Sequence, residues 1–310
     1  MQNQFLLSCE STVDMPYSYV NGRGIPLIFY TYAVDGIEYV DDMWRDPNAL
    51  LRFYSFIDEG KLPSTSMLTE TKYVEFFEQL LSQTDLPILH INFGSGMTPS
   101  VNNAYSAAKL LKEKYPNRRL EVIDSYCSSS GYGMLVDYAA DMRDEGRSID
   151  ETIEWVNAHR RNIHHQFFST ELKYFRRSGR MSGATAMLAT VLGICPIMRL
   201  DVDGKIIAYD KVHGKRNAVK RTVDMMEAHA VDGKDYTGKC FICHSNCIEE
   251  AERAKAALVE RFPKLSADDI RIFDIGTIIA AHCGPGTVAV FFLGDERAPY
   301  PEPEEYAFEN

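Results

Sequence analysis

The sequence predicts an α/β protein of two lobes, with an N-terminal parallel sheet wrapped by helices and a C-terminal α/β lobe. Short apolar runs alternate with helical patterns from residue 5 to residue 145, an order typical of a parallel sheet. The length of 310 residues exceeds what a single hydrophobic core usually organises. A helix over Ser148–His165, begun by Ser148 and Glu151 as a capping box, is expected to bridge the two lobes.

The first lobe, residues 1–165, contains the alternating series. Its predicted strands are Phe5–Ser8, Ile25–Val34, Ile88–Phe93 and Leu120–Ile123. Its predicted helices are Asn48–Asp58, Glu70–Ser82, Pro99–Tyr115 and Ser129–Glu145. In such sheets ligands bind beyond the carboxyl ends of the strands, so the segment Gly94–Thr98 is a candidate binding loop.

The second lobe, residues 166–294, also mixes strands and helices. Its predicted strands are Gln166–Thr170, Gly193–Leu200, Ile206–Asp210, Cys240–Cys243, Ile270–Phe273 and Val288–Phe292. Its predicted helices are Gly183–Leu192, Asn217–His229 and Ile248–Phe262. Residues 295–310 are rich in proline and acidic side chains, which predicts a solvated tail.

The segment that follows Ile88–Phe93 has the composition of a helix N-terminus. Pro99 suits the first helical position because it has no N–H to leave unpaired, and Thr98 can cap the helix with its side-chain oxygen. Free N–H groups and the helix dipole at such an end attract anions. Capping alone would explain these residues, and an anion site at Thr98 is the sharper hypothesis.

Composition excludes several classes of function. A net charge of −11 argues against a general nucleic-acid surface, although basic residues concentrate between Lys173 and Arg221. No run approaches eighteen apolar residues, so no membrane span is expected. The N-terminus lacks the pattern of a signal peptide, and seven cysteines fit a reducing compartment, which predicts a cytoplasmic protein.

Cys240-Phe241-Ile242-Cys243-His244 has the spacing of a c-type haem attachment site, with Cys247 as a further possible metal ligand. We expect neither haem nor metal here. The segment is predicted to be a strand, which directs Cys240 and Cys243 to opposite faces. No cofactor is expected elsewhere, because neither the P-loop pattern nor the dinucleotide glycine pattern is present.

Short motifs, in their order along residues 4–294, resemble those of the DegV family of bacterial fatty-acid-binding proteins. Glu10–Met15 resembles the family motif D-S-T-x-D-L, and Thr65-Ser66 resembles the start of T-S-Q-P. Gly94–Ser100 resembles S-S-G-L-S-G-T, and Ala281–Gly286 resembles A-H-T-G-P-G. The matching segments are Glu10–Met15, Pro26-Leu27, Tyr39 with Asp41, Thr65-Ser66, Gly94–Ser100, Ile123–Ser125 with Gly131 and Gly133, Gly179–Ser182, Pro196-Ile197 with Asp203–Lys205, and Ala281–Gly286.

The resemblance implies a carrier that binds a long-chain fatty acid and presents it to a separate fatty-acid kinase, and that catalyses nothing itself. It implies that Thr65 and Thr98 hold the carboxylate, with Ser95 as a helper and His282 as a nearby imidazole. The acyl chain is expected in the second lobe. Candidate wall residues there are Met187, Leu188, Val191, Leu192, Ile194 and Ile197. Candidate residues for docking the kinase are Arg180, Arg199, Lys211 and His213.

The chain departs from the family motifs at several positions. Met67-Leu68 replaces the Gln-Pro of T-S-Q-P, Gly94 replaces a serine, and Pro99 follows the key hydroxyl. His213 replaces an arginine on the face where the family meets its kinase. The departures near Thr65 and Thr98 keep both hydroxyls but alter the surroundings of the ligand.

The alternative is a lipid-directed serine hydrolase with Ser95 or Ser130 as nucleophile and His282 as base. The G-x-S-x-G pattern of such enzymes is missing, and Gly94-Ser95-Gly96 is too short a match. A nucleotide-dependent enzyme is a third possibility, which the missing phosphate-binding motifs disfavour.

Overall fold

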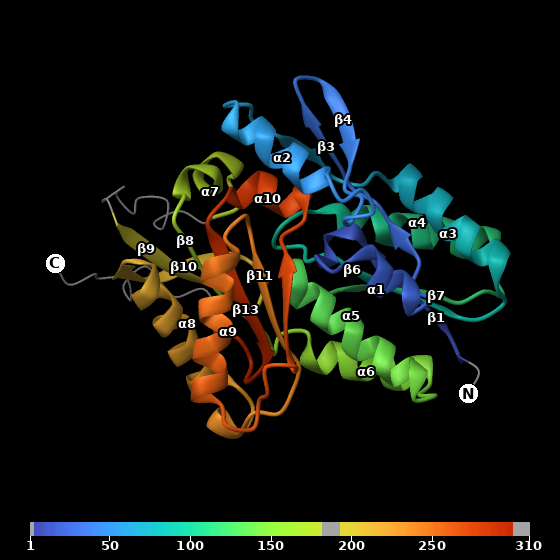
Figure 1. The fold of residues 1–310 in the computed structure, drawn as a ribbon. Helices are drawn as coiled ribbons and strands as arrows, with labels where there is room; N and C mark the ends of the chain where they lie inside the picture. The colour runs from blue at the N-terminus through green and yellow to red at the C-terminus, as the bar shows by residue number, and fades with distance from the viewer. Residues whose placement is uncertain (1–2, 182–192, 300–310) are drawn as a thin grey trace. The chain divides into compact units, whose positions relative to one another are not determined.

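The computed structural model describes residues 3–181 and 193–299, and it divides into two compact units. Unit 1 comprises Met1–Arg160 with Gly276–Ala281, and unit 2 comprises Arg161–Ile275 with His282–Asn310. Figure 1 shows both units as ribbons. The predicted helix Gly183–Leu192 lies outside the described residues, as do Met187, Leu188, Val191 and Leu192.

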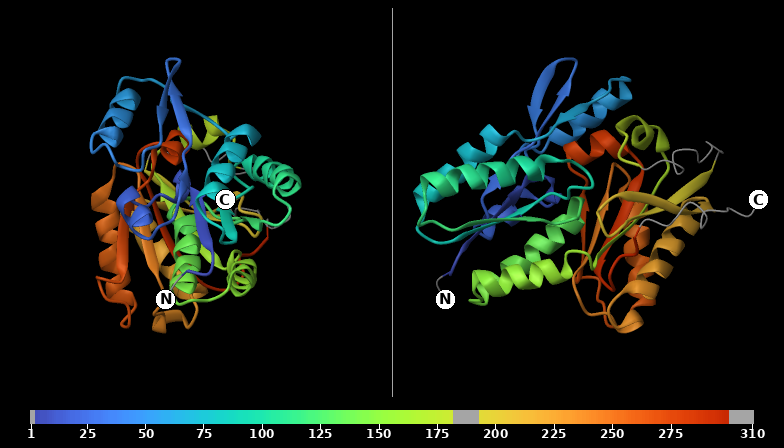
Figure 2. Two further views of the ribbon diagram at one scale, coloured as in Figure 1. Left: turned by 90° about the vertical axis from the view of Figure 1, so that its right-hand side faces the viewer. Right: turned by 180° about the vertical axis from the view of Figure 1, so that it is seen from behind.

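Unit 1 is built on a parallel sheet of order β2-β1-β6-β7. These strands are β1 (Leu6–Glu10), β2 (Leu27–Ile28), β6 (Ile88–Asn92) and β7 (Leu120–Asp124). The helices α3 and α4 cover one face, and α5 and α6 cover the other (Figures 1 and 2). The helices of the unit are η1 (Ser11–Val13), α1 (Tyr17–Gly22), α2 (Ala49–Asp58), α3 (Glu70–Gln83), α4 (Ser100–Lys114), α5 (Ser129–Asp144), α6 (Ile149–His159) and most of α10 (Thr277–Cys283).

A second, antiparallel sheet of order β4-β3-β5 belongs to unit 1. Its strands are β3 (Thr31–Val34), β4 (Ile37–Val40) and β5 (Ser64–Ser66). The predicted single strand Ile25–Val34 is therefore wrong, because β2 joins the parallel sheet whereas β3 pairs with β4. Asp35-Gly36 makes the turn of this hairpin with φ of 52° and 81°, a conformation that this dipeptide favours.

The helix after α5 is shorter than predicted. Ser148 and Glu151 form the expected capping box, but α6 ends at His159 and not at His165. The strand β8 (Ile163–Ser169) starts four residues later and pairs along its whole length with β13 (Thr287–Leu293). The ladder of hydrogen bonds ends the helix, and unit 1 accordingly ends at Arg160 rather than at residue 165. The six residues Gly276–Ala281 return the chain to unit 1.

Unit 2 contains a mixed sheet of order β10-β9-β8-β13-β11-β12, in which β11 and β12 are parallel. The remaining strands are β9 (Ile194–Leu200), β10 (Ile206–His213), β11 (Cys240–His244) and β12 (Ile270–Asp274). The helices are α7 (Leu172–Ser178), α8 (Lys215–His229) and α9 (Ile248–Arg261), with the short η3 (Gly233–Asp235). One face of the sheet is covered by α8 and α9, whose apolar residues share a core with Cys195 and Ile197 of β9.

The start of the predicted solvated tail is packed against unit 2. Arg297 is buried, and its backbone N–H donates to the carbonyl of Arg161 at 3.0 Å. The N–H of Asp295 donates to the carbonyl of His229 at 3.0 Å. The prediction of a solvated tail is therefore wrong for Arg297, whereas Asp295 and Glu296 expose their side chains in a segment whose backbone is held at Asp295 and Arg297. Residues 300–310 lie outside the described part.

Candidate functional site

The carboxyl edge of the parallel sheet in unit 1 carries the loop Gly94–Thr98, which the sequence analysis names as a candidate binding loop. The chain leaves β1, β6 and β7 at this edge and continues into Ser11–Asp14, Phe93–Thr98 and Ser125–Cys127. The strand order reverses between β1 and β6, because β2 lies on one side of β1 and β6 on the other. Such a reversal marks the ligand-binding position in open α/β sheets.

Gly94 allows the loops after β6 and β7 to touch. Its N–H donates to the carbonyl oxygen of Cys127 at 3.0 Å. A Cβ at this position would lie 2.6 Å from the same oxygen, which is too close for any side chain. Glycine at position 94 therefore permits this close approach of the two loops.

Most backbone N–H groups of the loop Gly94–Thr98 already donate to acceptors within unit 1. The N–H of Ser95 donates to Oδ1 of Asp124 at 3.0 Å. The N–H groups of Met97 and Thr98 donate to the carbonyl of Gly94 at 3.0 and 3.4 Å. The side chain of Ser95 is exposed, and the Asp124 carboxylate beside its amide would repel a bound anion. An anion at this edge must therefore depend on side-chain hydroxyls more than on loop amides.

Thr98 does not cap the following helix, so that prediction is wrong. The helix α4 begins at Ser100, and Pro99 occupies the N-cap position with φ of −76° and ψ of 13°. Thr98 lies one residue before the cap, because the turn closed by the Gly94 carbonyl sets where the helix can start. Its side chain is half-buried. Over the described residues the Thr98 hydroxyl makes no hydrogen bond, which leaves it available to a ligand.

Thr65 lies in a strand and not in a connecting segment. It is the middle residue of β5, pairs with Tyr32 of β3 and is half-buried. Asn103, in the first turns of α4, donates from Nδ2 to the carbonyl oxygen of Leu68 at 2.8 Å. The segment that carries Thr65 is thus held against the helix that follows Thr98.

A buried polar network around Glu10, which the sequence analysis did not identify, supports this edge. Glu10 is fully buried; one carboxylate oxygen accepts from the Tyr73 hydroxyl, and the other accepts from the Phe93 N–H at 2.8 Å. The hydroxyl of Ser100 lies 2.6 Å from that of Tyr30 and 3.3 Å from that of Tyr73. The network fixes the ends of β6 and the start of α4. Its members come from four separate segments, so no local sequence pattern reveals it.

Two buried aspartates form a second network in unit 1. Asp14 accepts a short hydrogen bond from the Ser129 hydroxyl, and Asp41 accepts from the Thr277 hydroxyl at 2.8 Å. A Cβ on Gly276 would lie 2.5 Å from Oδ1 of Asp14 and 3.4 Å from Oδ1 of Asp41. Burial raises the pKa of Asp41 to about 6, against the hydrogen bonds from Ser11 and Thr277, which lower it. Glycine at position 276 is what lets the chain pass both carboxyl groups.

His282 belongs to unit 2 and is half-buried. Burial, reinforced by the charges of Arg180 and Arg177, lowers the pKa of His282 to about 4. The imidazole is therefore neutral at pH 7. The following turn is closely packed, because Gly284 has φ of 68° and a Cβ there would collide with the ring of Tyr174.

The predicted docking residues differ in their surroundings. Arg180, Lys211 and His213 are exposed, the latter two on β10 at the edge of the sheet. Arg199 is partly engaged, since its guanidinium donates to the carbonyl of Ala298 at 2.9 Å. Several neighbouring cations are paired with acids, as in the contact of 2.7 Å between Arg221 and Asp210. The basic region of the sequence is thus less positive on the surface than its residue count indicates.

Of the predicted acyl-pocket residues, the structure describes Ile194 and Ile197. Ile194 lies at the start of β9. It is partly buried, and alternation along β9 places it on the sheet face opposite α8 and α9. Ile197 lies on the other face of β9 and is fully buried in the core that the sheet shares with α8 and α9.

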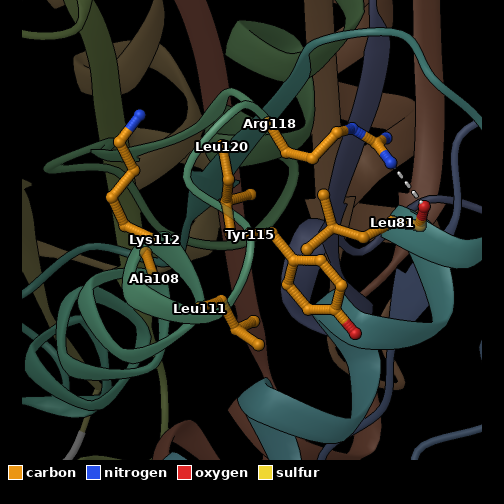
Figure 3. A pocket seen from close by; sticks show the side chains of 7 residues that line it. All are labelled: Leu81, Ala108, Leu111, Lys112, Tyr115, Arg118 and Leu120. Atoms are coloured by element: carbon orange, nitrogen blue, oxygen red, sulfur yellow. Dashed lines mark hydrogen bonds between the residues drawn. The ribbon is translucent and has the colours of Figure 1, made fainter.

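A small hollow in unit 1 is not an acyl site. It lies between the ends of α3 and α4 and the start of β7, at the amino edge of the parallel sheet (Figure 3). Its volume of about 10 Å³ is of the order that one water molecule occupies. Arg118 closes one side by donating to the carbonyl of Leu81 at 2.8 Å.

The structure gives little support to a serine nucleophile. Ser130 is buried, and its hydroxyl donates to the carbonyl of Asp14 at 2.8 Å. Ser8 does contact an imidazole, with its Oγ 3.0 Å from Nδ1 of His90, but both residues are fully buried. No substrate can reach that pair without unfolding β1. Neither Cys240 nor Cys243 of the C-x-x-C-H segment forms a disulfide, and Cys240 lies in the core beneath α8 and α9.

Fold and loop geometry together define a class of two-unit α/β proteins with a hydroxyl-bearing carboxyl edge. A family model of the DegV family, described as uncharacterised proteins, matches residues 6–295. A DegV domain-containing protein of Clostridium perfringens is 33% identical over 298 residues, covering 96% of this chain and 99% of that one. The chain therefore belongs to the DegV family.

Solved structures have the same fold. A fatty-acid-binding DegV protein of Thermus thermophilus superposes with a TM-score of 0.82 at 22% identity, over 94% of this chain and 99% of that one. A stearic-acid-binding protein of Eubacterium ventriosum gives 0.83 at 20% identity, over 94% and 99% of the two chains. Within residues 3–181 and 193–299, no helix has the length and apolar character needed to cross a bilayer.

Proposed function

We propose that this protein binds a long-chain fatty acid and holds its carboxylate with the hydroxyls of Thr65 and Thr98. The observation that carries the proposal is the half-buried Thr98 hydroxyl, which makes no hydrogen bond over the described residues. A half-buried hydroxyl without a protein partner can exchange water for a hydrogen bond to a ligand. The contact of Asn103 with Leu68 supports a site shared with the segment of Thr65.

Neutral donors suit a carboxylate at this edge. Hydroxyls can hydrogen-bond an anion without the desolvation cost of burying a lysine or arginine. His282 joins the proposal as a neutral imidazole, since its lowered pKa leaves one N–H donor and no net charge at pH 7. Ser95 is expected to contribute least to carboxylate binding, because its backbone N–H already donates to Asp124.

The acyl chain supplies most of the binding free energy. Each methylene removed from water contributes about 0.8 kcal/mol, so a sixteen-carbon chain contributes on the order of 10 kcal/mol before ordering costs. We place the chain in unit 2, with Ile194 as one wall residue and the candidates Met187, Leu188, Val191 and Leu192 outside the described part. The related proteins support the ligand class, since one is named as binding stearic acid and another was loaded with heptadecanoic acid.

The carrier role is the second part of the proposal. The protein would present its fatty acid to a separate fatty-acid kinase in the cytoplasm, and would itself form no covalent bond. The exposed side chains of Arg180, Lys211 and His213 are the proposed docking contacts. Arg199 is a weaker candidate, because its guanidinium already donates to the carbonyl of Ala298. None of the seven cysteines forms a disulfide, which agrees with a reducing compartment.

The test is displacement of a fluorescent fatty-acid analogue by palmitate from the purified protein and its variants. Thr98→Val should weaken palmitate binding roughly ten- to a hundredfold, the cost of one hydrogen bond to a charged group. Lys211→Ala should leave binding unchanged and lower acyl-phosphate formation when a cognate kinase is added. Equal palmitate affinity in wild type and Thr98→Val would remove Thr98 from the site.

A further inference from the structure

Two histidines and an aspartate from distant parts of the chain meet at one edge of unit 2. Nε2 of His164, on β8, lies 2.9 Å from Oδ1 of Asp295. Nδ1 of His229, the last residue of α8, lies 3.2 Å from the same oxygen and 3.1 Å from Oδ2. The three ligand atoms all lie within 4.8 Å of one another. Neither the fatty-acid proposal nor the docking proposal uses any of these residues.

We propose that His164, His229 and Asp295 bind a divalent transition-metal ion of the Zn²⁺ type. Two imidazole nitrogens with one carboxylate form a ligand set that Zn²⁺ commonly takes, with water at the fourth position. Bonds of about 2.0 Å in a tetrahedron place ligand atoms about 3.3 Å apart. The observed N···O contacts of 2.9–3.2 Å would widen by a few tenths of an ångström, and the three ligand atoms, all within 4.8 Å of one another, would adjust around the ion.

The backbone holds Asp295 in position for this role. Its N–H donates to the carbonyl of His229 at 3.0 Å, and the N–H groups of Gly294 and Arg297 donate to Asn162 and Arg161 at 2.8 and 3.0 Å. Gly294 leaves the space that the His164 ring needs, since a Cβ there would lie 2.8 Å from that ring. Because the backbone at Asp295 is already fixed, binding an ion requires little further loss of conformational entropy there.

Charges near the cluster act on a cation in opposite directions. The carboxylate of Asp295 attracts it, and each imidazole can offer a ring nitrogen that carries no proton. The ion would replace the hydrogen bonds between the ring nitrogens and the carboxylate. The charge of Arg297 weakens cation binding, so we expect an affinity below that of a four-ligand structural site.

The fourth ligand position faces solvent. The side chain of Asp295 is 59% exposed and that of His229 is 33% exposed, whereas that of His164 is 5% exposed. An ion can therefore enter from solvent with a bound water. The partial exposure also makes variants of His229 and Asp295 compatible with a folded protein.

The experiment uses the full chain, with any affinity tag removed, after chelator treatment and gel filtration. Co²⁺ is titrated first, with visible absorption as a direct sign of ligation, and Zn²⁺ affinity is then measured against a chromogenic chelator. We expect one equivalent per chain, and affinities at least about tenfold weaker in His229→Asn and in Asp295→Asn. The melting temperature of the wild type, but of neither variant, should rise with Zn²⁺.

Two control variants separate this site from others. His159→Asn removes a half-buried histidine of unit 1, and Cys247→Ser removes the cysteine that could join His244 in a competing site. Both should bind Zn²⁺ like the wild type. Three outcomes would overturn the proposal: no stoichiometric binding, binding unchanged in His229→Asn and Asp295→Asn, or binding lost in Cys247→Ser alone. The first outcome would identify the three residues as a hydrogen-bonded clasp that holds residue 295.

Discussion

The side-chain amide of Asn103 donates to the carbonyl oxygen of Leu68 at 2.8 Å, and so ties the segment after β5 to α4. Thr65 lies three residues before Leu68, and Thr98 lies five residues before Asn103. Residues about thirty positions apart in the chain are thereby held in one region of unit 1. This contact gives the proposed carboxylate site its internal support.

Asn103→Ala should loosen that support. We expect a loss of about 1 kcal/mol in unfolding free energy, the usual net value of one hydrogen bond. Palmitate affinity should fall with it, because the segment of Thr65 loses its tie to α4. Asn102→Ala is the matched control, since Asn102 is the exposed neighbour on the same helix. Chemical denaturation measures the unfolding free energy, and analogue displacement measures palmitate affinity. Equal values for Asn103→Ala and Asn102→Ala would argue against a supporting role of the Asn103–Leu68 hydrogen bond.

Thr98→Val and Thr69→Val should separate ligand binding from helix capping. Thr69 caps α3 by accepting from the Lys72 N–H at 3.3 Å, whereas Thr98 caps no helix. Thr69→Val should therefore cost about 1 kcal/mol of stability and leave palmitate binding unchanged. Thr98→Val should weaken palmitate binding and leave the unfolding free energy unchanged. A loss of stability in Thr98→Val equal to that in Thr69→Val would mean that its hydroxyl has a structural task after all.

Thr65→Val and Thr98→Val should be non-additive if both hydroxyls bind one carboxylate. Removal of either donor lets the carboxylate move or admit water, so the second removal costs less than the first. We expect a coupling free energy of at least about 0.5 kcal/mol in palmitate affinity. Calorimetric titration of the two single variants and the double variant measures it. Strictly additive losses would assign the two threonines to separate interactions.

Asp41 should make the protein less stable as pH rises from about 4 to 7. Its pKa is raised from 3.8 to about 6 by burial, so the folded protein binds a proton that the unfolded chain has released. Ionisation in the fold then costs roughly 3 kcal/mol. His164 and His282 act in the opposite direction, since their lowered pKa values make stability rise with pH between about 4 and 6.5.

The Asp41 contribution is therefore measured as a difference. Unfolding free energies of wild type and Asp41→Asn are compared from pH 4.5 to pH 7, where Asn can still accept from Thr277. The variant should gain stability relative to wild type with rising pH. Parallel curves for the two proteins would show that the Asp41 carboxyl titrates near its ordinary value.

Local patterns predicted the elements whose cause is local. The capping box of Ser148 and Glu151 and the apolar spacing of α3 and α9 needed no tertiary information. The tertiary packing at Gly133 is different, because a Cβ there would lie 2.5 Å from the carbonyl of Val13, a residue distant in the chain. The end of α6 could not be predicted, since pairing of β8 with a strand more than a hundred residues away decides it.

The candidate site was predicted in part. Motif order located the loops of Thr65 and Thr98, but not the capping state of Thr98, which depends on the turn closed by Gly94. The Glu10 network and the cluster of His164, His229 and Asp295 were missed, because each joins residues that only the fold brings together. A single sequence carries no signal for such contacts.

Mass spectrometry of an organic extract of the purified protein tests the central claim most directly. The protein is produced in a bacterial cytoplasm, washed free of loose lipid by gel filtration, and extracted beside Thr98→Val and Asn102→Ala prepared in the same way. We predict close to one long-chain fatty acid per chain for the wild type and for Asn102→Ala, and much less for Thr98→Val. An extract without fatty acid from wild-type protein that also fails to bind added palmitate would contradict the account.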